Sequence, residues 1–257
     1  MDYFKKYDHN PAEDLKWNIP ERKQGIMAVI GSNSQSFRTS VKVAEWLSAY
    51  PLESVNVVLP DALKNKLPPV PGLVFLGSTD SGSFANTDEL SKAIDAADSA
   101  LLIGDLSKNT TTARAVATAC QESTKPLFIT RDAVDLIADY QPERTLLNQN
   151  LVLMASITQL QKLLRAMYYP KMLMPSQPLV QVAETLHKFT LSYPTAIITL
   201  HNNQILMAYA GNVAAVPLDQ TDFTPLTFWS GELLAKIAVF NLYNPNNFIN
   251  ATLAGLF

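Results

Sequence analysis

The chain has 257 residues, a hydrophobic fraction of 47%, a charged fraction of 17% and a formal net charge of -3. This composition is typical of a globular protein with a sizeable core and excludes a disordered chain. The 20 lysines and arginines are scattered and outnumbered by 23 acidic residues, so we expect no nucleic-acid partner. No apolar segment approaches the length of a membrane span and the N-terminus is polar, so we expect no membrane partner and a cytoplasmic location.

Short apolar runs alternate with segments of helical periodicity from residue 25 onward. The runs GIMAVI, VNVVLP, GLVFLG, SALLIG, PLFIT and NLVLMA each precede such a segment. Continuous apolar runs are typical of strands buried on both faces of a parallel sheet, and helical connections predict right-handed crossovers with helices on both faces. Residues 1–24 are interpreted as an irregular N-terminal arm. Residues 25–257 are interpreted as one α/β domain, because no linker divides them.

The pattern changes after Pro178. A helix is predicted from Leu179 to Leu191, and three β-rich runs follow it, TAIITL, NQILMAYA and VAAVPL, joined by the turn-forming HNN and GN. We expect these runs to extend the sheet in antiparallel fashion. Two apolar helices are predicted after them, Trp229–Asn241 and Asn247–Phe257.

The common glycine-rich nucleotide motifs are absent from the sequence. No G-x-G-x-x-G follows a predicted strand, and neither a P-loop nor G-x-S-x-G occurs, which argues against a Rossmann-type dehydrogenase and an α/β-hydrolase. The three histidines, His9, His187 and His201, lie far apart in sequence, so we expect no metal site. Cys120 lies in a helical segment with no activating motif nearby, which predicts a structural thiol.

Polar residues follow the predicted strands, at the edge where parallel sheets bind ligands. Most of them are also ordinary helix-capping residues. The segment FWSGELLA places Ser230, Gly231 and Glu232 in the first turn of an apolar helix. The free N–H groups and the dipole of a helix start favour an anion, and a glycine there allows a phosphate to approach the main chain. An ordinary cap, with Glu232 complementing the dipole, explains the same residues.

The order of these segments resembles the ribokinase-like superfamily, and most of all its ADP-dependent NAD(P)H-hydrate dehydratase branch. VIGSNSQSFRTSVKVAEWL resembles the opening strand and Gly-Ser turn of that family, with Gly31 and Ser32 retained. SALLIGDLSKNT resembles a strand that ends in Gly-Pro-Gly-Leu-Gly, of which only Gly104 remains. PLFITRDAVDLI resembles the Asp-Ala-Asp-Ala-Leu-Asn segment, with Thr130 at its first aspartate and Asp132 at its second.

Later segments depart further from the family. NLVLMASITQLQKLL stands where the family has Leu-Thr-Pro-His-Pro-Gly-Glu-Phe and matches none of its polar or turn residues. TAIITLHNNQILMAY resembles the strand with Leu-Lys-Gly, with His201 in place of the lysine. TFWSGELLAKI resembles Gly-Thr-Gly-Asp-Val-Leu-Ala-Gly-Ile, in which Gly231 is retained and Glu232 replaces the catalytic aspartate. The resemblance implies a three-layer αβα sandwich with a mostly parallel central sheet and an antiparallel extension near the C-terminus.

The resemblance also implies a function and a set of site residues. It implies ADP or ATP with Mg²⁺ as cofactor and NAD(P)H-hydrate as substrate. Glu232 is the implied catalytic residue; the implied nucleotide-binding residues are Ser230, Gly231, Gly104 and His201, and the implied substrate-side residues are Gly31, Ser32 and Asp132.

Two interpretations remain open from the sequence. The first is a divergent dehydratase-like or kinase-like enzyme with a degenerate active site. The second is a non-catalytic pseudoenzyme of the same fold that acts as a nucleotide-binding or protein-assembly module. For this second interpretation we expect a homo-oligomer, with exposed apolar side chains at Phe228, Trp229 and Tyr243 available for an interface.

Overall fold

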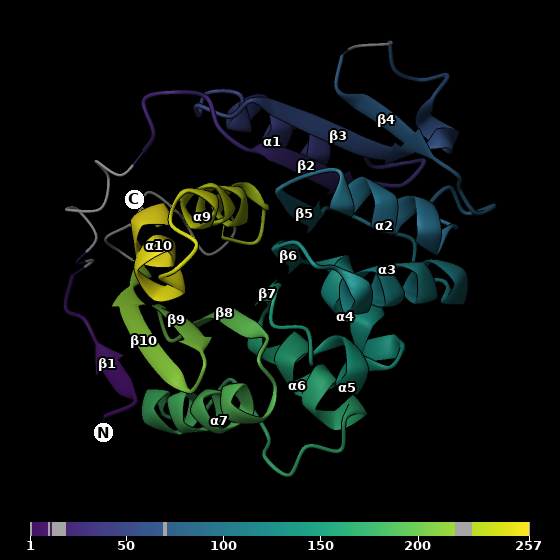
Figure 1. The fold of residues 1–257 in the computed structure, drawn as a ribbon. Coiled ribbons are helices and arrows are strands. Elements are labelled where there is room, and N and C mark those ends of the chain that lie inside the picture. Colours follow the sequence, from purple (N-terminus) through teal and green to yellow (C-terminus); the bar gives the residue numbers. More distant parts are fainter. Residues whose placement is uncertain (1, 10, 12–18, 69–70, 219–227, 257) are drawn as a thin grey trace.

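The computed structural model describes residues 2–9, 11, 19–68, 71–218 and 228–256. Its strands are β1 (Phe4–Lys6), β2 (Ile26–Gly31), β3 (Ser54–Pro60), β4 (Leu73–Leu76), β5 (Ser99–Ile103), β6 (Leu127–Thr130), β7 (Leu151–Met154), β8 (Ala196–His201), β9 (Gln204–Tyr209) and β10 (Asn212–Pro217). These strands form one sheet in the order β1-β10-β9-β8-β7-β6-β5-β2-β3-β4. Figure 1 shows that this sheet curves around the C-terminal helices.

The central part of the sheet is parallel, as the continuous apolar runs predict. Strands β2 to β8 pair in parallel with one another, and every residue of β5, β6 and β7 is buried. Because these strands run in one direction, their carboxyl ends meet at one edge of the sheet. Loops and helix starts that follow the strands therefore converge there.

The C-terminal strands form the expected antiparallel extension. β9 pairs antiparallel with both β8 and β10. Asn202 and Asn203 connect β8 to β9 with φ values of 48° and 58°, and Ala210 and Gly211 connect β9 to β10 with φ values of 48° and 78°. Positive φ at both central residues is the geometry of the tight turns whose twist suits a hairpin.

Helices cover both faces of the sheet, which confirms the three-layer α/β architecture. They are α1 (Arg38–Leu47), α2 (Thr87–Asp95), α3 (Thr110–Glu122), α4 (Asp132–Asp139), α5 (Pro142–Thr145), α6 (Ile157–Ala166), α7 (Leu179–Ser192), α9 (Glu232–Tyr243) and α10 (Phe248–Gly255). The alternating side chains of β2 separate the two cores: Met27 and Val29 pack in the layer of α1, α9 and α10, and Ala28 and Ile30 pack in the layer of α2, α3, α4, α6 and α7.

The structure differs from the sequence expectations at three places. The 1–24 segment, expected to be irregular, contains β1, which adds to the sheet edge by pairing in parallel with β10. The segment that follows VNVVLP, DALKNKL, was expected to be helical from its periodicity but forms only a short 3-10 helix at Asp61–Leu63. Helix α9 begins at Glu232 rather than Trp229, because Gly231 has a φ of 96° that no α-helical residue adopts.

Candidate functional site

Two adjoining cavities lie at the carboxyl edge of the sheet. The first, which we call the α1–α9 cavity, has a volume of about 250 Å³ and is lined by Arg38, Thr39, Lys42, Val43, Arg131, Ser230 and Glu232. The second, which we call the α4–α6 cavity, has a volume of about 290 Å³ and is lined by Arg131, Asp132, Asp135, Ser156, Gln159 and Trp229. Arg131 lines both, so the two cavities adjoin at the position where parallel sheets bind ligands, and we call them together the cleft.

Arg131 is held at the centre of this cleft by its backbone and by its side chain. It follows β6 directly and has φ 57° and ψ -128°, a conformation that non-glycine residues rarely adopt. Its carbonyl oxygen accepts a hydrogen bond from Gln159 Nε2 at 2.9 Å. Its guanidinium lies 2.6 Å from Asp105 Oδ1. Strained backbone that its surroundings enforce is concentrated at functional sites, so this conformation makes Arg131 a candidate functional residue.

Asp105 connects three loops at the same edge. Besides the ion pair with Arg131, its Oδ2 accepts a hydrogen bond from Ser36 Oγ at 2.8 Å. Its backbone oxygen accepts one from Asn33 Nδ2 at 3.2 Å. The loops after β2, β5 and β6 are therefore held together at this edge by Asp105.

Glu232, the implied catalytic residue, is in an ion pair. Its Oε1 lies 2.5 Å from Lys42 Nζ of α1, and its side chain is 24% exposed against 72% for Lys42. The backbone N–H of Glu232 donates to Ser230 Oγ at 3.4 Å. Gly231 precedes it in the left-handed region and packs against Ile103. The structure thus places Ser230, Gly231 and Glu232 together at the start of α9, with a lysine that the sequence interpretation had not included.

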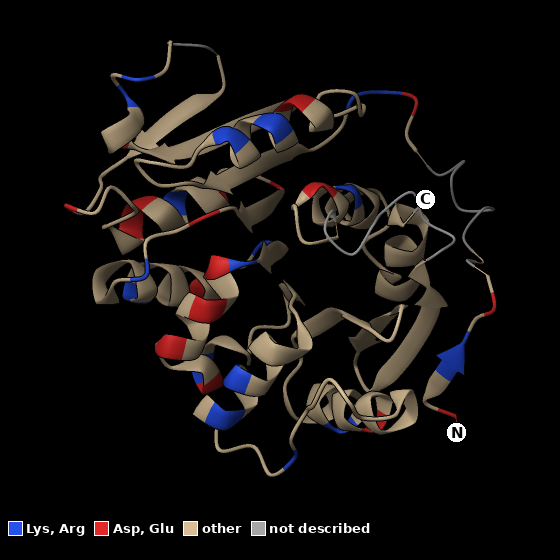
Figure 2. Ribbon diagram, turned by 180° about the vertical axis from the view of Figure 1, so that it is seen from behind, with Lys and Arg blue, Asp and Glu red and all other residues tan. Residues whose placement is uncertain are grey.

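The α4–α6 cavity has an acidic wall with its own cation. Asp132 accepts a hydrogen bond from the backbone N–H of Leu106 at 3.0 Å, which holds the loop after β5. Lys108 Nζ lies 3.0 Å from Asp135 Oδ2 and 3.4 Å from Asp132 Oδ1. The hydrogen bond that Lys108 donates to Asp135 and the charges of both aspartates raise the pKa of Lys108. Figure 2 shows acidic residues on α4 and basic residues on α1, the helices that line the two halves of the cleft.

Gly31, Ser32 and Gly104 lie at the same edge but face the protein interior. A Cβ at Gly31 would lie 2.0 Å from the carbonyl oxygen of Ile103, so β2 and β5 approach too closely there for any side chain. Ser32 is buried and its Oγ lies 2.9 Å from Ser40 Oγ. Gly104, with a φ of 82°, lies against Ser32 and Ser40. These contacts explain the three residues by packing, and none of them lines either cavity of the cleft.

His201 is not brought to the cleft-lining residues. It is 4% exposed at the end of β8, and its Nε2 donates to the carbonyl oxygen of Gln177 at 2.7 Å. The nucleotide-binding role of His201 stays a prediction.

Thr227, the first residue of the segment TFWSGELLAKI, lies outside the described residues.

The structure decides the expectations for Phe228 and Cys120, and it shows Tyr243 half-buried. Phe228 is fully buried, so the expectation that it is exposed for an interface is wrong; its ring packs edge-on against Trp229 with centroids 4.5 Å apart. Tyr243 is half-buried, and burial raises its pKa to about 12. Cys120 is buried, and burial raises the pKa of its thiol to about 12, which confirms the structural interpretation.

Three basic residues of the cleft were given no role from the sequence, although Arg131 was among the polar residues that follow the predicted strands. Arg38 and Lys42 are four residues apart in the first turns of α1, a spacing that places both on one face of a helix. Because α1 follows β2, that spacing was a usable signal. Arg131 directly follows β6, but its pairing with Asp105 joins residues 26 positions apart, which no local pattern reveals.

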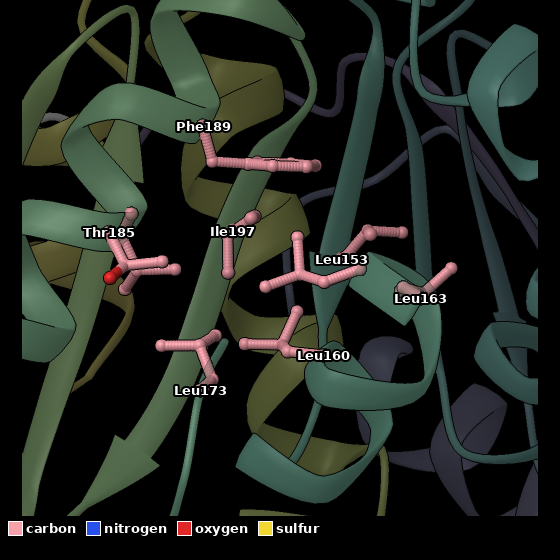
Figure 3. Close-up of a pocket in the computed structure, with 9 residues that line it drawn as sticks. Leu153, Leu160, Leu163, Leu173, Thr185, Phe189 and Ile197 are labelled. Atoms are coloured by element: carbon pink, nitrogen blue, oxygen red, sulfur yellow. The ribbon is translucent and has the colours of Figure 1, made fainter. Parts of the chain in front are cut away.

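The remaining features of the described structure do not indicate a metal site, a membrane span or a second ligand cavity in the core. Among the described residues, no three His, Cys, Asp or Glu side chains cluster where they would hold a metal ion. The part of the chain that the structure describes also contains no helix long and apolar enough to span a membrane. A small void of about 10 Å³ lies inside the core between α6, α7, β7 and β8 (Figure 3). Its lining is apolar apart from Thr185, and it has room for no more than one water molecule. We therefore interpret it as a packing defect of the core rather than a ligand site.

Comparison with known proteins shows the fold alone. No protein-family profile and no curated sequence matches the chain. Among solved structures, a ribokinase-like superfamily protein from Enterococcus faecalis is similar over 100% of this chain and 85% of its own, with a TM-score of 0.62 and 16% identity. YxkO of Bacillus subtilis, a member of the UPF0031 family, is similar over 97% and 86%, with a TM-score of 0.60 and 14% identity.

A third similar structure is that of ribokinase from Cryptococcus neoformans in complex with ADP. It covers 91% of this chain and 92% of its own, with a TM-score of 0.57 and 11% identity. The α/β sheet with its antiparallel portion, the helices on both faces and these likenesses agree. The chain has the ribokinase-like fold.

Proposed function

We propose that this protein binds an adenine nucleotide in the cleft at the carboxyl edge of the sheet, and that it derives from a NAD(P)H-hydrate dehydratase-like enzyme whose catalytic centre has degenerated. One observation carries the proposal: the carboxylate at the implied catalytic position, Glu232, is paired with Lys42 at 2.5 Å. The similar structures of ribokinase from Cryptococcus neoformans and of pyridoxal kinase from Bacillus subtilis are complexes with ADP, which supports a nucleotide as the ligand.

The ion pair bears directly on catalysis. A general base must lie within hydrogen-bond reach of the proton that it removes. Glu232 Oε1 instead contacts an ammonium group, and a glutamate carries its carboxylate one methylene farther from the backbone than the aspartate of the family. A misplacement of about one ångström costs about two orders of magnitude in rate. Binding is less demanding than turnover, so a cleft altered in this way retains binding more readily.

The residues present do not fit a Mg²⁺ ion held by the protein. Each carboxylate around the cleft is already paired with a cation: Asp105 with Arg131, Glu232 with Lys42, and both Asp132 and Asp135 with Lys108. Magnesium is bound by oxygen ligands with near-octahedral geometry, and no set of such ligands is free here among the described side chains. We therefore assign no step to a protein-held metal.

The test separates binding from turnover. Calorimetric titration with ADP and ATP is expected to give saturable heat in the micromolar to millimolar range, while hydrated NADH incubated with ADP, ATP and Mg²⁺ is expected to remain unconverted. Absence of binding at millimolar nucleotide contradicts the proposal. Conversion of hydrated NADH that is lost on Glu232→Ala supports the alternative, an active dehydratase with Glu232 as its base.

A second candidate function, protein assembly, has one supporting observation. The edge strand β4 and the adjacent β3 face a groove of about 310 Å³ beside α2, and Val74 in that groove is 40% exposed. Exposed apolar surface on an edge strand is suited to pairing with another chain. Light scattering tests the homo-oligomer that this function implies; a monomer at micromolar concentration contradicts it.

A further inference from the structure

The charges of the cleft are unevenly divided between its two cavities. Three cationic side chains and one carboxylate line the α1–α9 cavity. One cation and two carboxylates line the α4–α6 cavity. Arg131 belongs to both, so the basic half and the acidic half share one wall. A ligand that binds across this cleft is therefore selected for an anionic end that enters the basic half.

The three cations come from separate parts of the chain and converge on that half. Arg38 and Lys42 share one face of α1, four residues apart. Arg131 follows β6 and is held in place by Asp105 and Gln159. Lys42 is partly neutralised by Glu232 and Arg131 by Asp105. Among the described residues, no carboxylate forms an ion pair with Arg38.

The start of α9 also lies at this cavity. Ser230 and Glu232 line the cavity, Glu232 is the first residue of the helix, and Gly231 is the capping residue before it. Free N–H groups at a helix start carry partial positive charge and donate to anionic oxygens. The arginine guanidinium presents several donors in a planar fork that matches a phosphate, and lysine acts as a point charge.

We propose that Arg38, Lys42 and Arg131 form a phosphate-binding subsite that grips the terminal phosphate of the ligand by side-chain cations. This inference rests on the proposed function for the identity of the rest of the ligand. It deepens that function by assigning the phosphate end to the α1–α9 cavity. It also accounts for the lost glycines: side-chain cations take over the contact that glycine-rich turns supply through main-chain amides in other nucleotide-binding proteins.

The experiment compares three probes on five proteins. Pyrophosphate, ADP and adenosine are titrated calorimetrically into the full-length wild-type chain and into Arg38→Met, Lys42→Met, Arg114→Met and Lys188→Met. The last two are matched controls: Arg114 is an exposed arginine of α3, and Lys188 forms a 2.5 Å ion pair with Glu184 on α7, like that of Lys42 with Glu232. Circular dichroism melting curves verify that each variant folds.

We expect the wild type and both controls to bind pyrophosphate and ADP. Each cleft variant is expected to lose about tenfold or more in affinity for both, because a charge-assisted hydrogen bond is removed. Adenosine affinity is expected to be unchanged in all five proteins. Raising the salt concentration is expected to weaken pyrophosphate binding in the wild type more than in Lys42→Met, since a removed charge leaves less to screen. A sixth protein, Lys42→Arg, keeps the charge and is expected to bind pyrophosphate and ADP as the wild type does.

The outcomes separate this inference from the proposed function. Cleft variants that bind ADP and pyrophosphate as tightly as the wild type overturn the phosphate subsite and leave nucleotide binding in place. If the cleft variants lose pyrophosphate binding but the wild type binds ADP no more tightly than pyrophosphate, the phosphate subsite is supported and a nucleotide as the ligand is contradicted. Failure of the wild type to bind either probe overturns both.

Discussion

Gly31→Ala is expected to destabilise the fold strongly, although the sequence places this glycine on the substrate side of the site. The added methyl would lie 2.0 Å from the carbonyl oxygen of Ile103 and 2.9 Å from Ser40 Oγ. Gly31 and Ile103 are register partners on the adjacent central strands β2 and β5, so no flexible side chain can move to relieve the clash. Overpacking of a core costs about 1–3 kcal/mol, and a backbone clash between central strands places this change at about 3 kcal/mol.

Urea unfolding followed by circular dichroism measures this effect. With an m-value of about 3 kcal/mol per molar urea, the midpoint is expected to fall by about 1 M. Gly77→Ala is the matched control, because its added methyl would lie 3.4 Å from Glu89 Oε2, an ordinary contact, and its midpoint is expected to stay near that of the wild type. An unchanged midpoint for Gly31→Ala would refute the packing explanation and return Gly31 to the candidate ligand-binding residues.

Three further predictions address the cleft and the core. Trp229 is half-buried in the α4–α6 cavity, so Trp229→Ala is expected to weaken the binding of ADP and adenosine about tenfold, because stacking of the base on the indole ring is lost. Calorimetry should show pyrophosphate binding as tight as in the wild type, which excludes misfolding as the cause. Burial raises the pKa of the Cys120 thiol to about 12, so the protonated thiol contributes its full share of stability below the ordinary thiol pKa, and this share is lost as the pH rises toward 12. Thermal melts from pH 8 to 11 should show a falling melting temperature, and the fall should be smaller for Cys120→Ala. Leu160 is 3% exposed beside the small core void in Figure 3, so Leu160→Ala is expected to cost about 2–5 kcal/mol in urea unfolding, and a cost below 1 kcal/mol would contradict the tight packing described there.

Most of the fold was predictable because its signals are local. Each of β2 to β8 is a short apolar run, and each helix that follows carries its own periodicity and often its own cap, as with Ser156 and Gln159 at the start of α6. Strand β1 was missed because it is three residues long, largely exposed, and defined only by pairing with β10, far away in sequence. Pairing of that kind leaves no mark in a short stretch of sequence.

The candidate site was only partly predictable. Glu232, Gly231 and Ser230 were found from the start of an apolar helix and do line or adjoin the α1–α9 cavity. A glycine such as Gly31 does not reveal from sequence whether it leaves room for a ligand or for a neighbouring strand. Here it leaves room for the backbone of β5. The Lys42–Glu232 ion pair joins α1 to α9, which are far apart in sequence, so only the structure shows that the carboxylate of Glu232 is neutralised by a lysine.

The most direct test of nucleotide binding at this cleft is a crystal structure of the full-length chain grown with ADP. The proposal predicts ADP in the cleft, with its terminal phosphate in the α1–α9 cavity within hydrogen-bond distance of Arg38, Lys42 and Arg131. ADP bound elsewhere on the protein, with Lys42 still paired to Glu232 and the cleft free of ligand, would contradict it.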